Sequence, residues 1–284
     1  MGRVILSAFA DEFSSDIDTQ IKMLSENGIG YIEPRFIGEK NVADLTEDEA
    51  SEYAKMLDSY GVRASAIGSP IGKINLADDF EAHKERAKRC FANANILGAK
   101  NIRSFSFYLR DGKSREEERS EVIEKLGALL DIADSFGVTL CHENEAKIYG
   151  ETPEYCFDLM KTFGGRLRAV FDMGNFVLDG CRPYPDGYEL LRDYIAYFHI
   201  KDSLSVGAIV PAGCGEAKIA EILAAHKAYA KEDFYISLEP HLETFAGLNK
   251  LVGKAFENPY KFDSAEDAFA GGLKALRGVL AKLG

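Results

Sequence analysis

The sequence predicts a (β/α)8 barrel, the TIM-barrel fold of the α/β class. Short apolar runs bounded by turn residues alternate with amphipathic stretches along the chain, a pattern typical of parallel strands joined by crossover helices. Eight such pairs fit into 284 residues, which is close to the usual length of this barrel. We therefore expect residues 1–284 to form a single domain, and an open doubly wound sheet is the structural alternative.

The predicted strands are short runs rich in branched and aromatic residues. They span residues 3–9, 30–36, 62–68, 100–107, 138–144, 167–172, 195–202 and 234–240. Helix starts are indicated by three capping signals, which are Thr46 with Glu49, Ser114 with Glu117, and Thr152 before Pro153. Helix ends are indicated by glycines that can take a left-handed conformation, namely Gly61, Gly98 and Gly137.

Charge and cysteine content exclude several classes of protein. The net charge of −12 and the pI near 5.0 disfavour binding to nucleic acid or to anionic membranes. The five cysteines contain no C-x-x-C pair, so we expect buried thiols rather than disulfides or a zinc knuckle. The N-terminus lacks a long apolar run, and no run approaches the ~20 residues of a membrane span, so we expect a soluble cytoplasmic protein.

Four consecutive predicted strands end in a side chain that can bind a metal ion. These residues are Glu143, Asp172, His199 and Glu239. The carboxyl ends of barrel strands meet at one rim, so the four side chains should converge. A single carboxylate there often caps the next helix, and a single histidine is often a core residue, but four buried polar groups together need a cation. Three carboxylates and an imidazole suit one divalent ion, with Mn²⁺ as first choice and Mg²⁺, Co²⁺ or Zn²⁺ as alternatives.

The motifs around these positions resemble those of a known superfamily. "HENE" at 142–145, "FDMGN" at 171–175, "HIKD" at 199–202 and "LEPH" at 238–241 are similar to those of the sugar isomerase and epimerase superfamily of xylose isomerase-like barrels. That superfamily includes ketose 3-epimerases, hydroxypyruvate isomerases, inosose dehydratases and endonuclease IV-type DNA repair enzymes. The resemblance implies that Glu143, Asp172, His199 and Glu239 hold one divalent ion and that the two glutamates also move protons.

Two glutamates facing each other across an ion suit enolisation chemistry. A proton next to a carbonyl becomes acidic when a Lewis acid stabilises the enediolate. Abstraction on one face and delivery on the other inverts a carbon, whereas transfer between neighbouring carbons isomerises a sugar. We therefore expect Glu143 and Glu239 to be the catalytic residues of an isomerase or epimerase that acts on a sugar or sugar phosphate.

Further residues near the strand ends are candidate substrate contacts. Lys201 lies on the same strand face as His199, and it either holds a substrate oxygen or forms a surface ion pair with Asp202. His142 should face the opposite side, toward the helices. His241 follows the last strand closely enough to reach the pocket. Asn175 stands where many relatives have histidine, and an amide cannot carry a proton between acid and base forms at neutral pH.

Charged side chains near the other strands complete the expected rim. Arg35, Arg103 and Lys73 either supply positive charge to the pocket or solvate the surface. Arg35 and Glu145 are candidate substrate contacts. Glu33 resembles a second-strand acid of the family and should face inward near the base of the barrel, where it either pairs with an arginine or contacts the substrate. The glycine-rich stretch 210–218 lies where barrels often bind phosphate, so both phosphorylated and free sugars remain open.

Three other functions are consistent with parts of this pattern. An inosose-type dehydratase would use the same enolate and expel a hydroxyl group. A non-catalytic sugar-binding barrel would have no need of both glutamates. The DNA repair reading needs additional strand-end histidines, and the acidic chain disfavours it. Relatives are often oligomers, and the resemblance alone implies a homo-oligomer.

Overall fold

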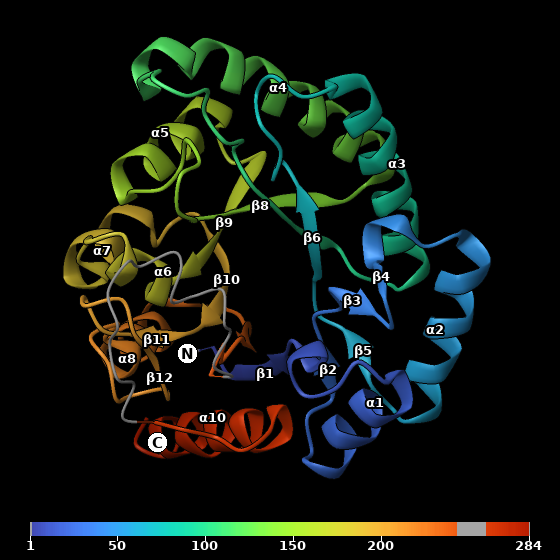
Figure 1. Cartoon of the computed structure of the whole chain (residues 1–284). Coiled ribbons are helices and arrows are strands. Elements are labelled where there is room, and N and C mark those ends of the chain that lie inside the picture. Colours follow the sequence, from blue (N-terminus) through green and yellow to red (C-terminus); the bar gives the residue numbers. More distant parts are fainter. Residues whose placement is uncertain (1, 243–259, 284) are drawn as a thin grey trace.

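Parallel strands form a closed ring in the computed structural model of the chain, which describes residues 2–242 and 260–283 (Figure 1). Seven strands pair in the order β1–β13–β10–β9–β8–β7–β6. The pair β2–β5 fills the remaining gap, because Glu33 N–H donates to Ala8 O at 3.0 Å and Gly68 N–H donates to Pro34 O at 2.9 Å. The ring confirms the predicted barrel and excludes the open doubly wound sheet. That all of residues 1–284 form one domain stays a prediction.

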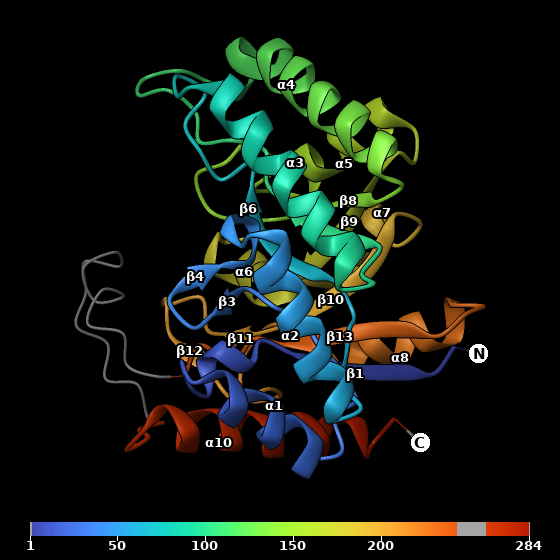
Figure 2. The ribbon, with the colours of Figure 1, turned by 90° about the vertical axis from the view of Figure 1, so that its right-hand side faces the viewer.

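The strands of the ring are short. They are β1 (Val4–Ala8), β2 (Tyr31–Ile32), β5 (Arg63–Ala64), β6 (Ile67–Ile71), β7 (Asn101–Ser104), β8 (Thr139–Glu143), β9 (Leu167–Asp172), β10 (Ile195–Ile200) and β13 (Phe234–Leu238). Two hairpins extend from the ring, formed by β3 (Phe36–Ile37) with β4 (Lys40–Asn41) and by β11 (Asp202–Ser203) with β12 (Ile209–Val210). Figure 2 shows both hairpins on the side of the barrel away from the N-terminus, where the strands end.

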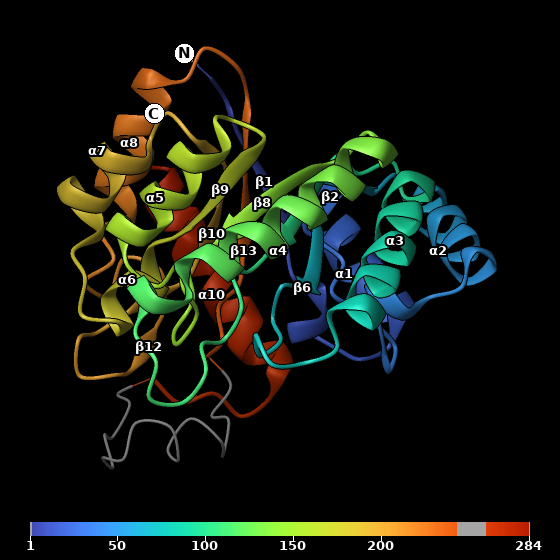
Figure 3. The same ribbon diagram turned by 90° about the horizontal axis from the view of Figure 1, so that it is seen from above.

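The helices lie outside the ring, and α3 packs beside α4 (Figures 1 and 3). They are α1 (Ile17–Glu26), α2 (Glu47–Ser59), α3 (Phe80–Ile96), α4 (Arg115–Phe136), α5 (Pro153–Phe163), α6 (Met173–Leu178), α7 (Tyr188–Leu191), α8 (Ile219–Tyr229) and α10 (Ala265–Leu280). The described part of the chain also contains the short turns η1 (Ala10–Glu12), η2 (Val42–Asp44) and the π-helical η3 (Pro183–Gly187). Among the described residues no helix is long and apolar enough to span a bilayer.

Most of the predicted boundary signals act as expected. Both capping boxes form, and Gly61, Gly98 and Gly137 take φ angles of +69°, +72° and +66°. Thr152 is the N-cap residue of α5 and Pro153 lies in the first turn, as predicted, but the Thr152 hydroxyl donates to Glu154 and makes no capping hydrogen bond. All five cysteines are free thiols; Cys214 is exposed, contrary to the prediction of buried thiols.

Alternation along the strands divides the core into two parts. Leu140, Phe171, Phe198 and Ile236 belong to the large apolar cluster shared with the helices, and their neighbours form a small separate cluster of Ala66, Cys141, Val170 and Tyr197. The side chains two residues further along β8, β9 and β10 face the same way as Cys141, Val170 and Tyr197, because alternate residues share a face. The inward-facing side chains are therefore ionisable at the carboxyl ends of these three strands, and the layer directly below them is mainly apolar.

Candidate metal centre

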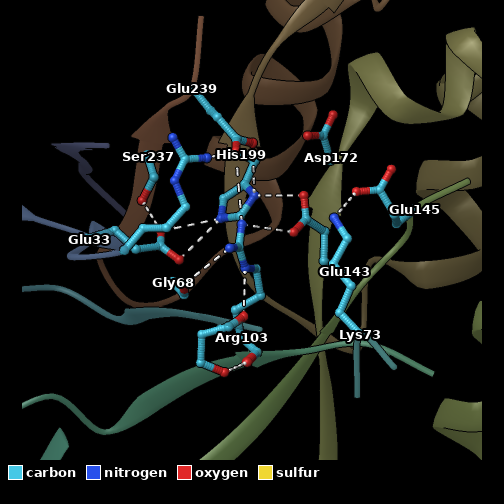
Figure 4. Close-up of polar contacts among 12 residues, drawn as sticks. Glu33, Gly68, Lys73, Arg103, Glu143, Glu145, Asp172, His199, Ser237 and Glu239 are labelled. Atoms are coloured by element: carbon cyan, nitrogen blue, oxygen red, sulfur yellow. Dashed lines mark hydrogen bonds and ion pairs between the residues drawn. The ribbon is translucent and has the colours of Figure 1, made fainter. Parts of the chain in front are cut away.

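The four predicted metal ligands meet at one point. Glu143 ends β8, Asp172 ends β9, His199 lies near the end of β10, and Glu239 directly follows β13. One donor atom from each lies within 4.8 Å of all the others, and all four residues are buried. Figure 4 shows them converging from neighbouring strands. The convergence follows from the register, because His199 pairs with Asp172 on one side and with Ser237 on the other.

The two ring nitrogens of His199 face different carboxylates. Nδ1 lies 2.9 Å from Glu143 Oε1 and 3.5 Å from Glu239 Oε2, whereas Nε2 lies 3.2 Å from both oxygens of Glu33 (Figure 4). Burial alone would lower the pKa of His199, but the charges of Glu143 and Glu33 outweigh burial and raise it to about 10. When Nε2–H donates to Glu33, the lone pair of Nδ1 is directed at the other ligands, which is the tautomer a metal requires.

One predicted role of Glu33, an ion pair with an arginine, is wrong. It is fully buried and accepts hydrogen bonds from Tyr197 Oη at 2.9 Å and Ser237 Oγ at 2.5 Å, in addition to its contact with His199. The sequence could not show this, because the three partners lie on β10 and β13, far from Glu33 in the chain. Glu33 therefore lies behind His199 and away from the pocket mouth.

Lys201 points into the cluster and makes no surface ion pair with Asp202, so the surface alternative is wrong. Its Nζ lies 3.0 Å from Asp172 Oδ2, 3.2 Å from Glu239 Oε2 and 3.1 Å from Asn175 Oδ1. Burial lowers the pKa of Lys201, but Asp172 and Glu239 raise it, and the net result lies well above the ordinary value. The ammonium group is therefore a fixed positive charge beside two of the four ligands.

Two arginines form ion pairs with the two glutamates of the cluster. Arg103 Nη1 lies 3.2 Å from Glu143 Oε2, and Arg35 Nη1 donates to Glu239 Oε1 at 2.9 Å. Arg35 also contacts Asp11 and Glu12, which follow β1. Burial would raise the pKa of Glu143, but His199 and Arg103 lower it to about 2, so this carboxylate is ionised at neutral pH. Arg103 and Arg35 thus supply charge to the rim, and neither simply solvates the surface.

Asn175 and Asn144 fix the loop that follows the cluster. The Asn144 side chain bonds both the N–H and the C=O of Asp172, at 3.0 and 2.8 Å. The main-chain N–H of Asn175 donates to Asp172 Oδ1 at 2.8 Å. The side-chain nitrogen Nδ2 of Asn175 lies 2.9 Å from Asn144 O and 3.5 Å from Glu143 Oε1. The amide of Asn175 therefore lies against the ligands, while its role as a substrate contact stays a prediction.

The remaining candidates lie further out on the rim. His241 Nε2 is 3.4 Å from Glu12 Oε1 and 3.9 Å from Glu239 Oε1. Glu145 Oε2 accepts a bond of 2.8 Å from Lys73 Nζ, and both side chains are partly exposed (Figure 4). These positions are compatible with substrate contact, which stays a prediction for both. His142 faces away from the cluster, as predicted, and its Nε2 lies 2.9 Å from Ser106 Oγ.

Asp11 and Glu12 were not predicted as site residues from the sequence. They lie in η1, a short distance after the first strand, so the strand-end position that predicted Glu143 and Asp172 extends to them as well. Both contact Arg35, which in turn contacts the ligand Glu239. They therefore form an outer layer of the same charged network.

The glycine-rich stretch 210–218 is not an open phosphate cradle. Asp202 Oδ2 accepts the N–H groups of Gly213 at 2.7 Å and Gly215 at 2.9 Å, and Oδ1 accepts that of Ala217 at 3.1 Å. A carboxylate of the chain already occupies the position that a phosphate would need. The prediction of a phosphate site at these amides is therefore not supported by the geometry.

The donor set fits a divalent cation. Glu239 Oε2 is buried and accepts no hydrogen bond from the described residues, although the nitrogens of Lys201 and His199 lie 3.2 and 3.5 Å away. Oxygen and imidazole donors directed at one another are the ligands that Mn²⁺, Mg²⁺ and Zn²⁺ accept in proteins. The residues that would hold the ion are Glu143, Asp172, His199 and Glu239.

Comparison with known proteins agrees with this architecture. The sequence model of the family described as xylose isomerase-like TIM barrel matches residues 21–262. The chain belongs to this family. No curated protein sequence is significantly similar to it.

Solved structures of the same fold cover nearly the whole chain. A probable 3-DHS dehydratase, AsbF, from Bacillus anthracis is 18% identical with a TM-score of 0.73, and 98% of this chain and 99% of that chain are covered. The IOLI protein with a bound zinc atom is 19% identical, with the same TM-score and coverage. D-psicose 3-epimerase from Clostridium cellulolyticum H10, with D-tagatose, is 13% identical with a TM-score of 0.72 and again 98% and 99% coverage. Identities this low show a shared fold.

Proposed function

We propose that the protein is a divalent-metal-dependent isomerase or epimerase that moves a proton on a sugar or sugar phosphate through an enediolate. One observation carries the proposal: two buried glutamates, Glu143 and Glu239, approach the same nitrogen of His199 at 2.9 and 3.5 Å. Two carboxylates beside one cation site can act on a substrate held between them. Mn²⁺ is the proposed ion, and the zinc in the related IOLI structure supports a divalent metal in general.

The bound ion would supply the Lewis acidity that stabilises negative charge on the substrate oxygens. Glu143, ionised at neutral pH because His199 and Arg103 lower its pKa, takes the proton next to the carbonyl. For epimerisation, Glu239, held by Arg35, takes up a proton from solvent or a substrate hydroxyl and delivers it to the opposite face. For isomerisation, the proton held by Glu143 returns to the neighbouring carbon. Lys201 lies between Asp172 and Glu239, where its ammonium can stabilise a developing oxyanion.

A dehydratase is the second candidate, and Lys201 is the observation that favours it. An ammonium group beside two carboxylates can donate to a departing hydroxyl after the same proton abstraction. The fold shared with a probable 3-DHS dehydratase is consistent with this reaction. A small carbohydrate substrate, a cytoplasmic location and a homo-oligomer also remain predictions.

Proton exchange in deuterated water tests the proposal. Metal-loaded and metal-stripped protein is incubated with ketoses, ketose phosphates and inososes, and carbon-bound deuterium is measured. We expect metal-dependent incorporation with formation of an epimer or isomer, whereas loss of water would identify the dehydratase.

The two glutamates give the decisive variants. Glu143→Gln and Glu239→Gln should each reduce exchange by about 10³-fold or more, because an amide cannot accept the proton. Glu189→Gln on α7 is the control, since Glu189 is exposed and pairs only with Arg192 among the described residues. Full turnover by either site variant would refute the assignment.

A further inference from the structure

We propose that a cavity beside the metal centre binds an uncharged ring at the far end of the substrate, so that the natural substrate is unphosphorylated and longer than a single free sugar. The inference rests on the proposed function, because it concerns the second half of the molecule whose reacting end meets Glu143 and Glu239. It names the substrate class that the strand-end residues alone left open.

The cavity has a volume of about 790 Å³ and lies between η1, the hairpin β3–β4 and the start of α10. Its walls are mainly apolar, with Phe13, Phe36, Pro240, Leu242 and Phe269 among the lining residues. Phe13 and Phe269 pack edge to face with their ring centroids 5.9 Å apart. Phe36 is 43% exposed, so much of its ring is accessible to a ligand in the cavity.

The cavity borders the metal centre at Arg35. This residue lines the cavity, and its Nη1 also donates to the ligand Glu239 at 2.9 Å. Pro240 and His241, which line the cavity as well, are the next two residues after Glu239. A substrate with its reacting end at Glu239 would therefore extend into this space.

The charges around the cavity disfavour a phosphate. Arg35 is shared by Asp11, Glu12 and Glu239, and Lys73 Nζ is paired with Glu145 at 2.8 Å. A phosphate would have to break these ion pairs and would meet the carboxylates of Asp11 and Glu12. Within residues 2–242 and 260–283, no cation that lines the cavity is without an acidic partner.

Two buried polar atoms of the cavity lining, Asp11 Oδ1 and His241 Nδ1, have no hydrogen-bond partner among the described residues. A buried carboxylate oxygen in this state is stabilised by a hydroxyl donor and repels a phosphoryl oxygen. An aromatic wall with a hydroxyl acceptor at its edge suits a neutral ring that carries hydroxyl groups or an aryl group.

Three ketoses with the same reacting end and different distal groups test the inference. D-fructose, 6-O-benzyl-D-fructose and D-fructose 6-phosphate are titrated into the Mn²⁺-loaded protein by calorimetry. We expect the benzyl ether to bind at least tenfold more tightly than D-fructose, and the phosphate to bind no more tightly than D-fructose. A phosphate that binds most tightly, or three equal affinities, would overturn the inference.

Two variants locate the effect. Phe36→Ala should remove most of the preference for the benzyl ether and leave D-fructose binding unchanged, and Ala265→Phe, which narrows the cavity at the start of α10, should do the same. Tyr60→Ala is the matched control, because Tyr60 is 40% exposed at the end of α2 and does not line the cavity. An equal loss in Tyr60→Ala would also overturn the inference.

Failure of the inference and failure of the proposed function give different results. Deuterium exchange is measured with the same three ketoses. The proposed function predicts exchange whether or not the protein binds one of them more tightly than the others. Metal-dependent exchange without a Phe36-dependent preference counts against the cavity alone. A Phe36-dependent preference in binding without any exchange counts against the proposed chemistry and supports the cavity.

Discussion

His199 has a metal-facing nitrogen and a nitrogen that faces Glu33, and the proton should stay on the second. Nε2 lies 3.2 Å from the Glu33 oxygens. An ionised carboxylate has no proton to donate, so Nε2 must carry the proton of this hydrogen bond. This arrangement orients the ring and keeps Nδ1 unprotonated when a metal is bound. Partners of this kind are usually worth 10–100-fold in metal affinity.

Glu33→Gln should therefore weaken Mn²⁺ binding by roughly 10–100-fold, because an amide can donate to Nε2 and shift the proton to Nδ1. The measurement is competition with a fluorescent chelator. Ser237→Ala is the control, since it removes one hydrogen bond to Glu33 and keeps the carboxylate. Equal effects of the two variants would show that packing, rather than the tautomer, is what Glu33 maintains.

Lys201 competes with the metal for two of its ligands. Its ammonium lies 3.0 Å from Asp172 Oδ2 and 3.2 Å from Glu239 Oε2, where a positive charge repels a second cation. Lys201→Met should raise the affinity for Mn²⁺ by about tenfold or more and reduce turnover. The metal-free variant should also be less stable, by about 3 kcal/mol or more, because buried carboxylates lose their partner.

Calorimetric Mn²⁺ titration and urea unfolding of the metal-free protein check both effects. Lys73→Met is the control, because Lys73 pairs with Glu145 on the rim and does not contact the four ligands. A lower metal affinity in Lys201→Met would contradict the competition.

These residue contacts mark the limit of what the sequence predicts. The ligands Glu143, Asp172, His199 and Glu239 could be selected because each stands at the end of a strand, and strand ends share a rim. The partners of Lys201 and Glu33 could not, because they depend on side chains from different strands that meet only in the closed ring.

At the scale of the elements, the barrel strands were predictable and the loops were not. Each predicted strand contains an observed one, because apolar patterning and turn residues act locally. The loop 210–218 depends instead on Asp202, which lies several residues earlier and fixes it through bonds to main-chain N–H groups. Glycine spacing alone left a phosphate site possible there, and it gave no sign of the carboxylate.

Asp202→Asn should lower the free energy of unfolding by about 3 kcal/mol, because one acceptor oxygen becomes a donor that faces main-chain N–H groups. Amides 213, 215 and 217 should exchange with solvent faster. Glu216→Gln in the same loop is the control, and only its bonds to Ser205 change. Urea unfolding and hydrogen exchange provide the two readouts. A stable Asp202→Asn protein that binds phosphate at this loop would instead restore the phosphate prediction.

For the whole molecule, buried neutral histidines link stability to pH. His83 and His226 lie outside the metal centre and are buried, and burial lowers the pKa of each to about 4. His83 Nε2 accepts the N–H of Gly72 at 2.8 Å, a bond that only the unprotonated nitrogen can accept. Protonation of either residue is therefore easier in the unfolded chain, where the pKa is about 6.5.

The direction of the effect follows from this difference. Above pH 6.5 each histidine is neutral in both the folded and the unfolded chain, and its full contribution to the free energy of unfolding is present. Between pH 6.5 and 4 the unfolded chain binds more protons, so the free energy of unfolding falls as the pH is lowered. Each histidine contributes on the order of 3 kcal/mol to this fall.

The net charge of −12 works in the opposite sense, because acidification toward the pI near 5.0 reduces the repulsion within the folded protein. A histidine variant separates the two effects. His83→Gln keeps an acceptor for Gly72 and removes one proton site, so the loss of stability between pH 7 and 4.5 should be smaller than in the wild type by about 1–3 kcal/mol. Urea unfolding at several pH values measures this difference. Parallel pH profiles for the two proteins would mean that His83 takes up its proton equally in the folded and unfolded states, and that the Gly72 bond does not hold it neutral.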